Sequence, residues 1–296
     1  MMESKKLKIG LALGGGGVRG FVHLGIYEVL YEHKIPISCV SGTSMGAIIG
    51  GCIAMGYSPK ITKEIALKYK ELNLLSWKNF NFFKESLFKR EELDKIFDTA
   101  FANATFKDTE IPFRCTSVNI ETEEKVVHSK GLLKTAIAAS SAYSPVFAPV
   151  FDEGRYLIDG GILDLVPVSS LRDLNVEKLI AVRLEHNLTK QFVSGQIYKK
   201  HYKKNQKPKK NKWYDVPLKF LQEKKQDVAF LIDIAVENAS IAAGKISDIE
   251  LEKAKPDLLF NPIVNIGLLD FSKMDEAIEI GRNIALKNLD EIKSWI

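Results

Sequence analysis

The sequence has little of what disulfide-stabilised, metal-binding or membrane-spanning proteins need. Its three cysteines, Cys39, Cys52 and Cys115, lie in apolar runs and share no metal-ligand spacing. We therefore expect buried free thiols. No apolar run reaches the roughly 18 residues of a transmembrane helix, and the N-terminus lacks the apolar stretch of a secretory signal. These absences predict a protein of the cytoplasm, with peripheral membrane contact as the closest approach to a bilayer.

Acidic residues are missing from one strongly basic segment. The formal net charge is +5, yet residues 199–212 contain eight lysines and no acid, so the rest of the chain is slightly acidic. Two interpretations stay open: a solvated loop, or a patch (Lys199–Lys212) that docks on anionic lipid. Nucleic-acid binding is not expected, because no aromatic residue other than Tyr202 interrupts the lysines.

The first 55 residues alternate between strand and helix patterns. Residues 8–13 and 37–40 read as short apolar strands. Residues 21–33 have helical periodicity, and a second helix follows Ser44. This order predicts a parallel sheet with crossover helices, which is an α/β fold.

The remaining elements extend the same pattern within one domain. Its core motifs span 7–185, a Lys-rich loop covers about 196–214, and a helical part covers about 215–296. Further strands are expected over 113–120, 125–128, 155–158, 179–184 and 257–260, and further helices over 132–139, 216–254 and 274–295.

A glycine-rich turn follows the first strand. Gly15, Gly16, Gly17 and Gly20, with Arg19 before the last glycine, match G-x-G-x-x-G. A dinucleotide site would also need an acid about 20 residues further on, and the second strand ends without one. The alternative is an oxyanion hole, in which backbone N–H groups at a helix N-terminus hold a developing negative charge.

The turn after the second strand has the pattern of a nucleophile elbow. Gly42-Thr43-Ser44-Met45-Gly46 fits G-x-S-x-G. In this motif the turn is so sharp that the first and last positions, here Gly42 and Gly46, must lack side chains. Parallel strands end at one sheet edge, so Ser44 and the glycine-rich turn should meet there. Ser44 is the candidate nucleophile.

The sequence near Ser44 has no histidine to take its proton. Asp159 ends an apolar strand and precedes Gly160 and Gly161, so burial would raise its pKa toward that of a general base. A Ser44–Asp159–His186 triad follows the chain order of α/β-hydrolases and stays an alternative. Asp164 is a weaker candidate acid and is expected to be structural.

Three motifs in this order, G-G-G-x-R-G at 15–20, G-T-S-M-G at 42–46 and D-G-G at 159–161, resemble the patatin-like phospholipase family. The segments "AIAASSAYSPVFAPV" and "YLIDGGILDLVPV" add to the resemblance. It implies a three-layer α/β/α fold with a mainly parallel central sheet. It also implies a Ser44–Asp159 dyad, with Gly15, Gly16, Gly17 and Arg19 at the oxyanion hole, acting on lipid acyl esters without metal or cofactor.

Several functional questions stay open at this level. Acyl transfer to an acceptor other than water, and a lipid-binding regulatory protein with low turnover, are alternatives to hydrolysis. The lipid class, the oligomeric state and the role of the aromatic segment 77–88, as core, lid or membrane contact, are not determined by the sequence.

Overall fold

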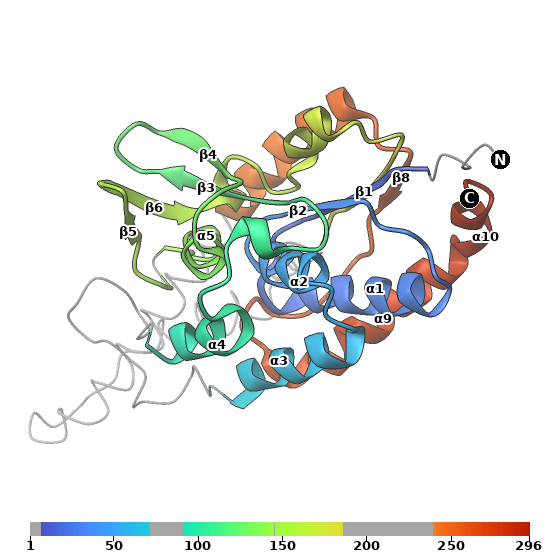
Figure 1. The fold of residues 1–296 in the computed structure, drawn as a ribbon, viewed down its shortest axis with the longest axis horizontal. Coiled ribbons are helices and arrows are strands. Elements are labelled where there is room, and N and C mark those ends of the chain that lie inside the picture. Colours follow the sequence, from blue (N-terminus) through green and yellow to red (C-terminus); the bar gives the residue numbers. More distant parts are fainter. Residues whose placement is uncertain (1–6, 72–90, 145, 186–238) are drawn as a thin grey trace, which may run out of the picture.

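The computed structural model describes residues 7–71, 91–144, 146–185 and 239–296 (Figure 1). A central sheet separates two helical layers, which confirms the expected three-layer fold. The strands are β1 (Ile9–Leu13), β2 (Cys39–Gly42), β3 (Phe113–Asn119), β4 (Glu124–His128), β5 (Val150–Asp152), β6 (Arg155–Asp159), β7 (Lys178–Val182) and β8 (Leu258–Phe260).

Helices α1 (Val22–Glu32), α2 (Met45–Ala54), α5 (Leu133–Ser140) and α9 (Met274–Lys287) cover one face of the sheet, and α3 (Pro59–Glu71) and α4 (Glu91–Phe101) pack outside them. A 3₁₀ helix, η5 (Val168–Leu174), and a helix described over residues 239–254 cover the other face. The short helical elements are η1 (Gly17–Phe21), η3 (Phe106–Asp108), η4 (Gly160–Ile162), η6 (Phe271–Lys273) and α10 (Leu289–Lys293).

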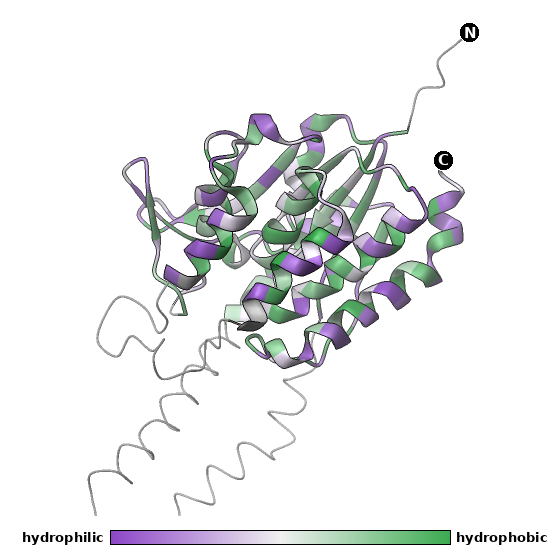
Figure 2. Cartoon of the chain, turned by 60° about the horizontal axis from the view of Figure 1, so that its bottom comes forward, coloured by the Kyte–Doolittle hydropathy of each residue, from purple (hydrophilic) through white to green (hydrophobic). Residues whose placement is uncertain are grey.

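The two faces of the sheet follow the period-2 alternation of a β-strand. On β1, Ile9, Leu11 and Leu13 belong to the larger core under α1, α2 and α9. Ala12 belongs to the smaller core, which includes Leu171 of η5 and Leu251 of the helix over 239–254. In the helices, hydrophobic and hydrophilic residues also alternate along the chain (Figure 2).

The sheet changes from parallel to antiparallel at β3. Strands β8, β7, β1, β2 and β3 pair in parallel in that order, whereas β4 and β6 pair antiparallel with β3, and β5 with β6. The core of the sheet is therefore parallel, as predicted, with an antiparallel extension at one end.

One side of β3 is shared by two strands. Cys115 pairs with Gly42 of β2 and with His128 of β4, so these two strands flank β3 on opposite sides. Ser117 pairs with Asp159 of β6 on one side and with Val126 of β4 on the other. Strands β2 and β6 therefore occupy the same side of β3 and run toward each other, and their carboxyl ends are two β3 residues apart, about 7 Å.

Helices α1 and α9 pack at backbone distance. A Cβ on Gly25 would lie 1.9 Å from the Ile278 carbonyl oxygen, and one on Gly281 would lie 2.0 Å from the Val22 carbonyl oxygen. Arg282 of α9 also donates hydrogen bonds to Glu28 and Glu32 of α1, at 2.8 to 3.1 Å. The last helix is thus part of the layer that supports the first.

Most expected elements occur within a few residues of their predicted bounds. Strand β5 was missed, and the predicted helix over 274–295 is divided into α9 and α10 at Asn288. The three cysteines are buried and free, as predicted. The predicted helix over 216–254 is described only from residue 239, and the aromatic segment 77–88 and the Lys-rich loop lie outside the described residues.

We predict that Gly281→Ala destabilises the protein by about 2 kcal/mol or more, because the added methyl group meets backbone atoms that cannot rotate away. Urea unfolding measures the change. The matched control is Gly267→Ala, where the new Cβ would meet its nearest atom at 3.6 Å. Equal stability of the two variants would contradict the close packing of α1 and α9.

Candidate active site

Three turns meet at the end of the parallel strands. Gly14–Gly17 follows β1, Ser44 follows β2 and Asp159 ends β6. Gly15, Gly16, Gly17, Arg19, Ser44, Asp159 and Gly161 all line one cavity of about 400 Å³, a size typical of a ligand site. The structure thus brings the three predicted motifs together.

Ser44 has the strained backbone of a nucleophile elbow. Its φ is 56° and its ψ is −124°, a region that non-glycine residues rarely occupy. The flanking glycines allow this turn: a Cβ on Gly42 would lie 2.3 Å from the Gly46 oxygen, and one on Gly46 would lie 2.2 Å from the Leu13 oxygen. Neither position has room for a side chain.

The end of α5 supports the elbow from outside. The Ser44 N–H donates to Ser140 Oγ at 3.0 Å, and Ser141 Oγ donates to the Ser44 carbonyl at 3.4 Å. Helix α2 begins at Met45, so its positive end lies at the Ser44 hydroxyl. Sequence reasoning assigned no role to Ser140 or Ser141, although they lie within the "AIAASSAYSP" segment.

Asp159 is 2% exposed, and one of its oxygens is already held. Oδ1 accepts a hydrogen bond from the Gly161 N–H at 2.8 Å. Oδ2 is buried, and no described group forms a hydrogen bond of ordinary geometry with it. Burial raises the pKa of Asp159 to about 6, while the nearby Ser44 hydroxyl and the Gly161 N–H act in the opposite direction.

The glycines after β1 differ in what their N–H groups contact. The Gly15 N–H donates to the Leu165 carbonyl at 2.9 Å. Gly15 is expected at the oxyanion hole from the sequence, but in this structure its N–H is not available to a substrate. Within the described residues, no hydrogen bond engages the N–H groups of Gly16 and Gly17. Gly17 has a φ of +55°, and a Cβ there would lie 2.4 Å from the Leu268 oxygen.

Two basic side chains hold this loop. Arg19 Nε donates to the Gly16 carbonyl at 3.2 Å, and Arg19 is 5% exposed. His23 Nε2 is 2.7 Å from the Gly14 carbonyl, so this nitrogen carries the proton. Burial lowers the pKa of His23 to about 4, so the ring is neutral at pH 7.

Gly20 lies at the contact between the glycine-rich turn and the serine turn. A Cβ on Gly20 would lie 2.4 Å from Met45 Cγ, so a glycine at this position lets the two turns approach each other.

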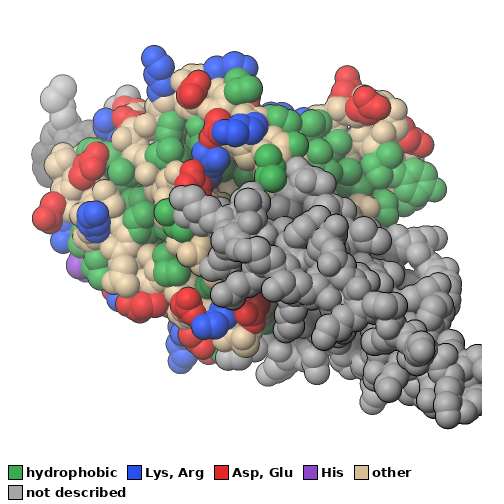
Figure 3. All heavy atoms as spheres, turned by 180° about the vertical axis from the view of Figure 1, so that it is seen from behind, with side chains coloured by type: hydrophobic (Ala, Val, Ile, Leu, Met, Phe, Trp, Pro, Cys, Tyr) green, Lys and Arg blue, Asp and Glu red, His purple; other side chains and the backbone are tan. Residues whose placement is uncertain are grey.

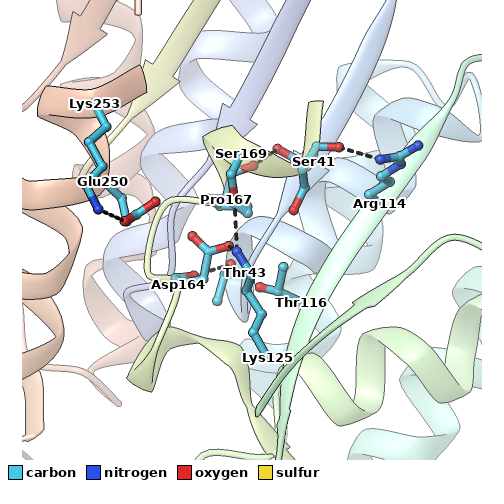
Figure 4. A network of polar contacts seen from close by, with 11 residues as sticks. Ser41, Thr43, Arg114, Thr116, Lys125, Asp164, Pro167, Ser169, Glu250 and Lys253 are labelled. Atoms are coloured by element: carbon cyan, nitrogen blue, oxygen red, sulfur yellow. Dashed lines mark hydrogen bonds and ion pairs between the residues drawn. The ribbon is translucent and has the colours of Figure 1, made fainter. Parts of the chain in front are cut away.

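A buried hydroxyl network begins at Thr43, the residue before Ser44 (Figure 4). Thr43 Oγ1 donates to the Asp164 carbonyl at 2.8 Å, and Thr116 Oγ1 lies 2.8 Å from Thr43 Oγ1. Because the Thr43 proton goes to Asp164, Thr116 must be the donor to Thr43. The network joins the end of β2, the middle of β3 and the loop after Asp159.

An ion pair completes this network. Lys125 Nζ on β4 donates to Asp164 Oδ2 at 2.9 Å and to Ser169 Oγ at 3.0 Å. The Asp164 side chain is 3% exposed and that of Lys125 is 32% exposed. Asp164 is therefore structural, as expected. Gly160 packs against the backbone of Thr116, a member of this network: a Cβ on Gly160 would lie 2.3 Å from the Thr116 carbonyl oxygen.

The cavity has walls of two kinds. The apolar wall contains Met45, Ile48, Leu93, Phe97, Val146, Phe147, Leu268, Leu269 and Phe271. The other wall contains Arg183, Glu185, Lys245 and Asp248, which sequence reasoning missed because no motif contains them. His186, the alternative base, lies outside the described residues. Across the described part of the chain, no three His, Cys, Asp or Glu side chains gather as metal ligands would.

Comparison with known proteins agrees with this geometry. The family model described as Patatin-like phospholipase matches residues 11–172, more than half of the chain. The chain belongs to the patatin-like phospholipase family. The match covers the glycine-rich turn, the elbow and the D-G-G turn, which confirms the resemblance seen in the sequence.

Similar curated proteins are much longer than this chain. It is 28% identical over 285 residues to "Lysophospholipase NTE1" of Meyerozyma guilliermondii, covering 92% of this chain and 18% of that protein. It is 27% identical over 294 residues to the Coccidioides immitis protein of the same name, covering 97% and 18%. The chain therefore spans about a fifth of the length of these relatives.

A similar fold occurs in a solved structure, VipD from Legionella pneumophila. The TM-score is 0.52 at 14% sequence identity, with 96% of this chain and 67% of that chain covered. At this identity the likeness concerns the fold alone, and it agrees with the layers described above.

We predict that Lys125→Met destabilises the protein by about 2–3 kcal/mol, because it leaves the buried Asp164 carboxylate without its cation. The double variant Lys125→Met/Asp164→Asn should recover much of the loss. Lys134→Met is the control, because its pair with Asp98 lies at the surface and is worth less than about 1 kcal/mol. Equal losses in urea unfolding for Lys125→Met and Lys134→Met would contradict the role of the ion pair.

We predict that Asp159→Asn stabilises the folded protein by roughly 2 kcal/mol at pH 8, since folding raises the pKa of this carboxyl from 3.8 to about 6. The folded wild type binds this proton more tightly than the unfolded chain, so its stability falls as the pH rises from about 4 to about 6.

The gain of Asp159→Asn should therefore vanish near pH 4. Thermal unfolding between pH 4 and 8 measures it. Asp173→Asn is the control, because the hydrogen bond from Arg114 lowers the pKa of that exposed carboxyl, and this variant should show no gain at pH 8. A gain of Asp159→Asn that is constant with pH would refute the raised pKa.

Proposed function

We propose that this chain is a serine acyl hydrolase that cleaves the fatty-acyl ester of a lysophospholipid or a related lipid through a Ser44–Asp159 dyad. One observation carries the proposal. A buried carboxyl with a pKa raised to about 6 lies beside a serine in a strained elbow, within the same cavity. Family membership and the printed name of the relatives, lysophospholipase, support the choice of substrate.

In the first step, Ser44 Oγ attacks the acyl carbonyl carbon while Asp159 takes its proton. Oδ2 is the receiving atom, because Oδ1 is held by the Gly161 N–H. A pKa near 6 leaves Asp159 ionised at pH 7 and still basic enough to accept the proton. A hydrogen bond from Ser44 to Oδ2 would form as the substrate enters, since catalytic contacts commonly tighten in the substrate complex.

Negative charge then develops on the former carbonyl oxygen. The N–H groups of Gly16 and Gly17 are the donors for this oxyanion, and the positive end of α2 adds to the stabilisation. Arg19 keeps Gly16 in place through its carbonyl. The bond to the alcohol breaks, and Asp159 gives its proton to the departing oxygen, which leaves an acyl-Ser44.

The acyl-enzyme is cleaved by the reverse sequence of proton transfers. Asp159 takes a proton from a water molecule, whose oxygen attacks the acyl carbon, and the fatty acid leaves as Ser44 recovers its proton. Because the same carboxyl serves both halves of the reaction, a histidine is not required. If an alcohol replaces water in this step, the product is a transferred acyl ester.

A lipid substrate suits the cavity because most of its lining is apolar. We propose that the protein reaches its substrate at the membrane surface. Among the described residues, no helix is long and apolar enough to cross a membrane. Membrane contact through Lys199–Lys212 stays a prediction, because these residues lie outside the described part.

We predict that Ser44→Ala and Asp159→Asn each reduce the hydrolysis of a p-nitrophenyl acyl ester by about 10³-fold or more, because each removes an essential proton-transfer partner. His186→Ala should retain activity. Circular dichroism controls for folding, and product analysis with added alcohol measures acyl transfer separately.

The pH profile of the wild type provides a second test of the base. kcat/KM should rise with pH through an apparent pKa near 6, because only the ionised carboxyl of Asp159 accepts the proton. An inactive His186→Ala variant would instead favour the triad. A wild type without activity on any ester would favour a lipid-binding protein with low turnover.

A further inference from the structure

The charged wall of the cavity has a composition that ester hydrolysis does not require. It contains two cations, Arg183 and Lys245, and two anions, Glu185 and Asp248. Arg183 and Glu185 follow β7, next to the glycine-rich turn, and Lys245 and Asp248 lie on the helix over 239–254. The wall therefore brings two distant parts of the chain together in the lining of the cavity that contains Ser44.

These four charges are held in a defined order. Arg183 Nη1 donates to Asp248 Oδ1 and lies 3.6 Å from Glu185 Oε1. Glu185 is fixed in turn by Asn261 Nδ2 at 2.8 Å. Lys245 Nζ is 3.5 Å from Asp248 Oδ2, with the side chain 81% exposed, so this ammonium can turn toward a ligand at little cost.

A glycine, Gly244, lies beside the guanidinium of Arg183. Apart from the chain neighbours of Gly244 and the backbone of its own helix, Arg183 Nη2 is the one described heavy atom within 4 Å of the point where a Cβ on Gly244 would stand, at 3.8 Å. Gly244 itself lines the cavity. The glycine thus leaves space beside two N–H donors whose planar geometry suits a phosphate.

Charges of both signs in one part of the lining select for a ligand that carries both. A headgroup with phosphate alone would meet Glu185 and Asp248, and an uncharged headgroup would desolvate the ion pairs without replacing them. On the face seen in Figure 3, basic and acidic side chains of the described part are likewise interspersed among apolar ones rather than separated by sign.

We propose that Arg183, Lys245, Glu185 and Asp248 form a headgroup subsite that determines specificity. Lys245 and the outer N–H groups of Arg183 bind the phosphate, and Glu185 with Asp248 face the cationic amine of the same headgroup. The acyl chain lies along the apolar wall, with its ester at Ser44. This inference rests on the proposed function, because it takes the ester position from the Ser44–Asp159 dyad.

The test compares two substrates that share a palmitoyl chain and differ in headgroup: lysophosphatidylcholine and monopalmitoylglycerol, in mixed detergent micelles. We expect Lys245→Ala to lower the ratio of their kcat/KM values about 5- to 10-fold, through KM for the phosphate-containing substrate, because one charge-assisted contact is lost. Arg183→Lys, which keeps the charge but loses the planar donors, should lower the ratio in the same direction.

Lys253→Ala is the matched control. Lys253 lies on the same helix, is 62% exposed and pairs with Glu250 outside the cavity lining, so its removal should leave the ratio at the wild-type value. A ratio that is unchanged in both Lys245→Ala and Arg183→Lys would overturn the subsite, as would an equal change in Lys253→Ala.

Binding separates the subsite from the chemistry. In a Ser44→Ala background, Lys245→Ala should weaken equilibrium binding of lysophosphatidylcholine and change that of monopalmitoylglycerol less. If the wild type hydrolyses no ester, the proposed function fails, and this binding difference still decides the subsite. If hydrolysis depends on Ser44 but neither ratio nor binding changes, the subsite alone is wrong.

Discussion

The candidate site depends on one constraint, the sharing of one side of β3 by β2 and β6. Because the two strands point at each other along the same neighbour, the turn after β2 and the end of β6 have to meet. Side-chain direction alternates along a strand, so a slip of β6 by one residue would move the Asp159 carboxyl to the other face. The contact between Gly160 and Thr116 opposes such a slip, since nothing larger than glycine fits there.

Around this constraint the polar groups are divided between two levels. Ser44, Asp159 and the N–H groups of Gly16 and Gly17 line the cavity and keep unused hydrogen-bonding capacity among the described residues. The lower level, formed by Thr43, Thr116 and the Lys125–Asp164 pair, is fully engaged. The strained elbow costs about 1–3 kcal/mol, and the rigid level beneath it, with Ser140 at its side, offsets that cost.

Much of this arrangement could be predicted from the sequence, because its motifs are local consequences of backbone geometry. Glycines at Gly42 and Gly46 mark a turn with no room for Cβ atoms, and an aspartate at the end of an apolar strand predicts a buried carboxyl. Strand β5 was missed because it has three residues and directly follows Pro149, where patterns are too short to read.

Other features of the site depend on distant pairings that no local pattern encodes. The Gly15 N–H is engaged by Leu165, 150 positions away in the chain. The charges of Arg183 and Asp248 meet only because β7 and a later helix pack together, and single charged residues on a helix or after a strand are indistinguishable from ordinary surface positions. The direction of β6 relative to β2 likewise follows from register, which the sequence motifs do not specify.

The packing of α9 on α1 has a consequence for biosynthesis. The glycine-rich loop is synthesised before its supports. Val182 and Leu268 carry the carbonyls that hold Gly14 and Val18, and Gly281, which packs on Val22, follows later still. Until α9 is made, the apolar face of α1 that it covers has no partner, and exposed apolar surface of this kind favours aggregation. Ser44 is thus synthesised before the residues that complete its surroundings.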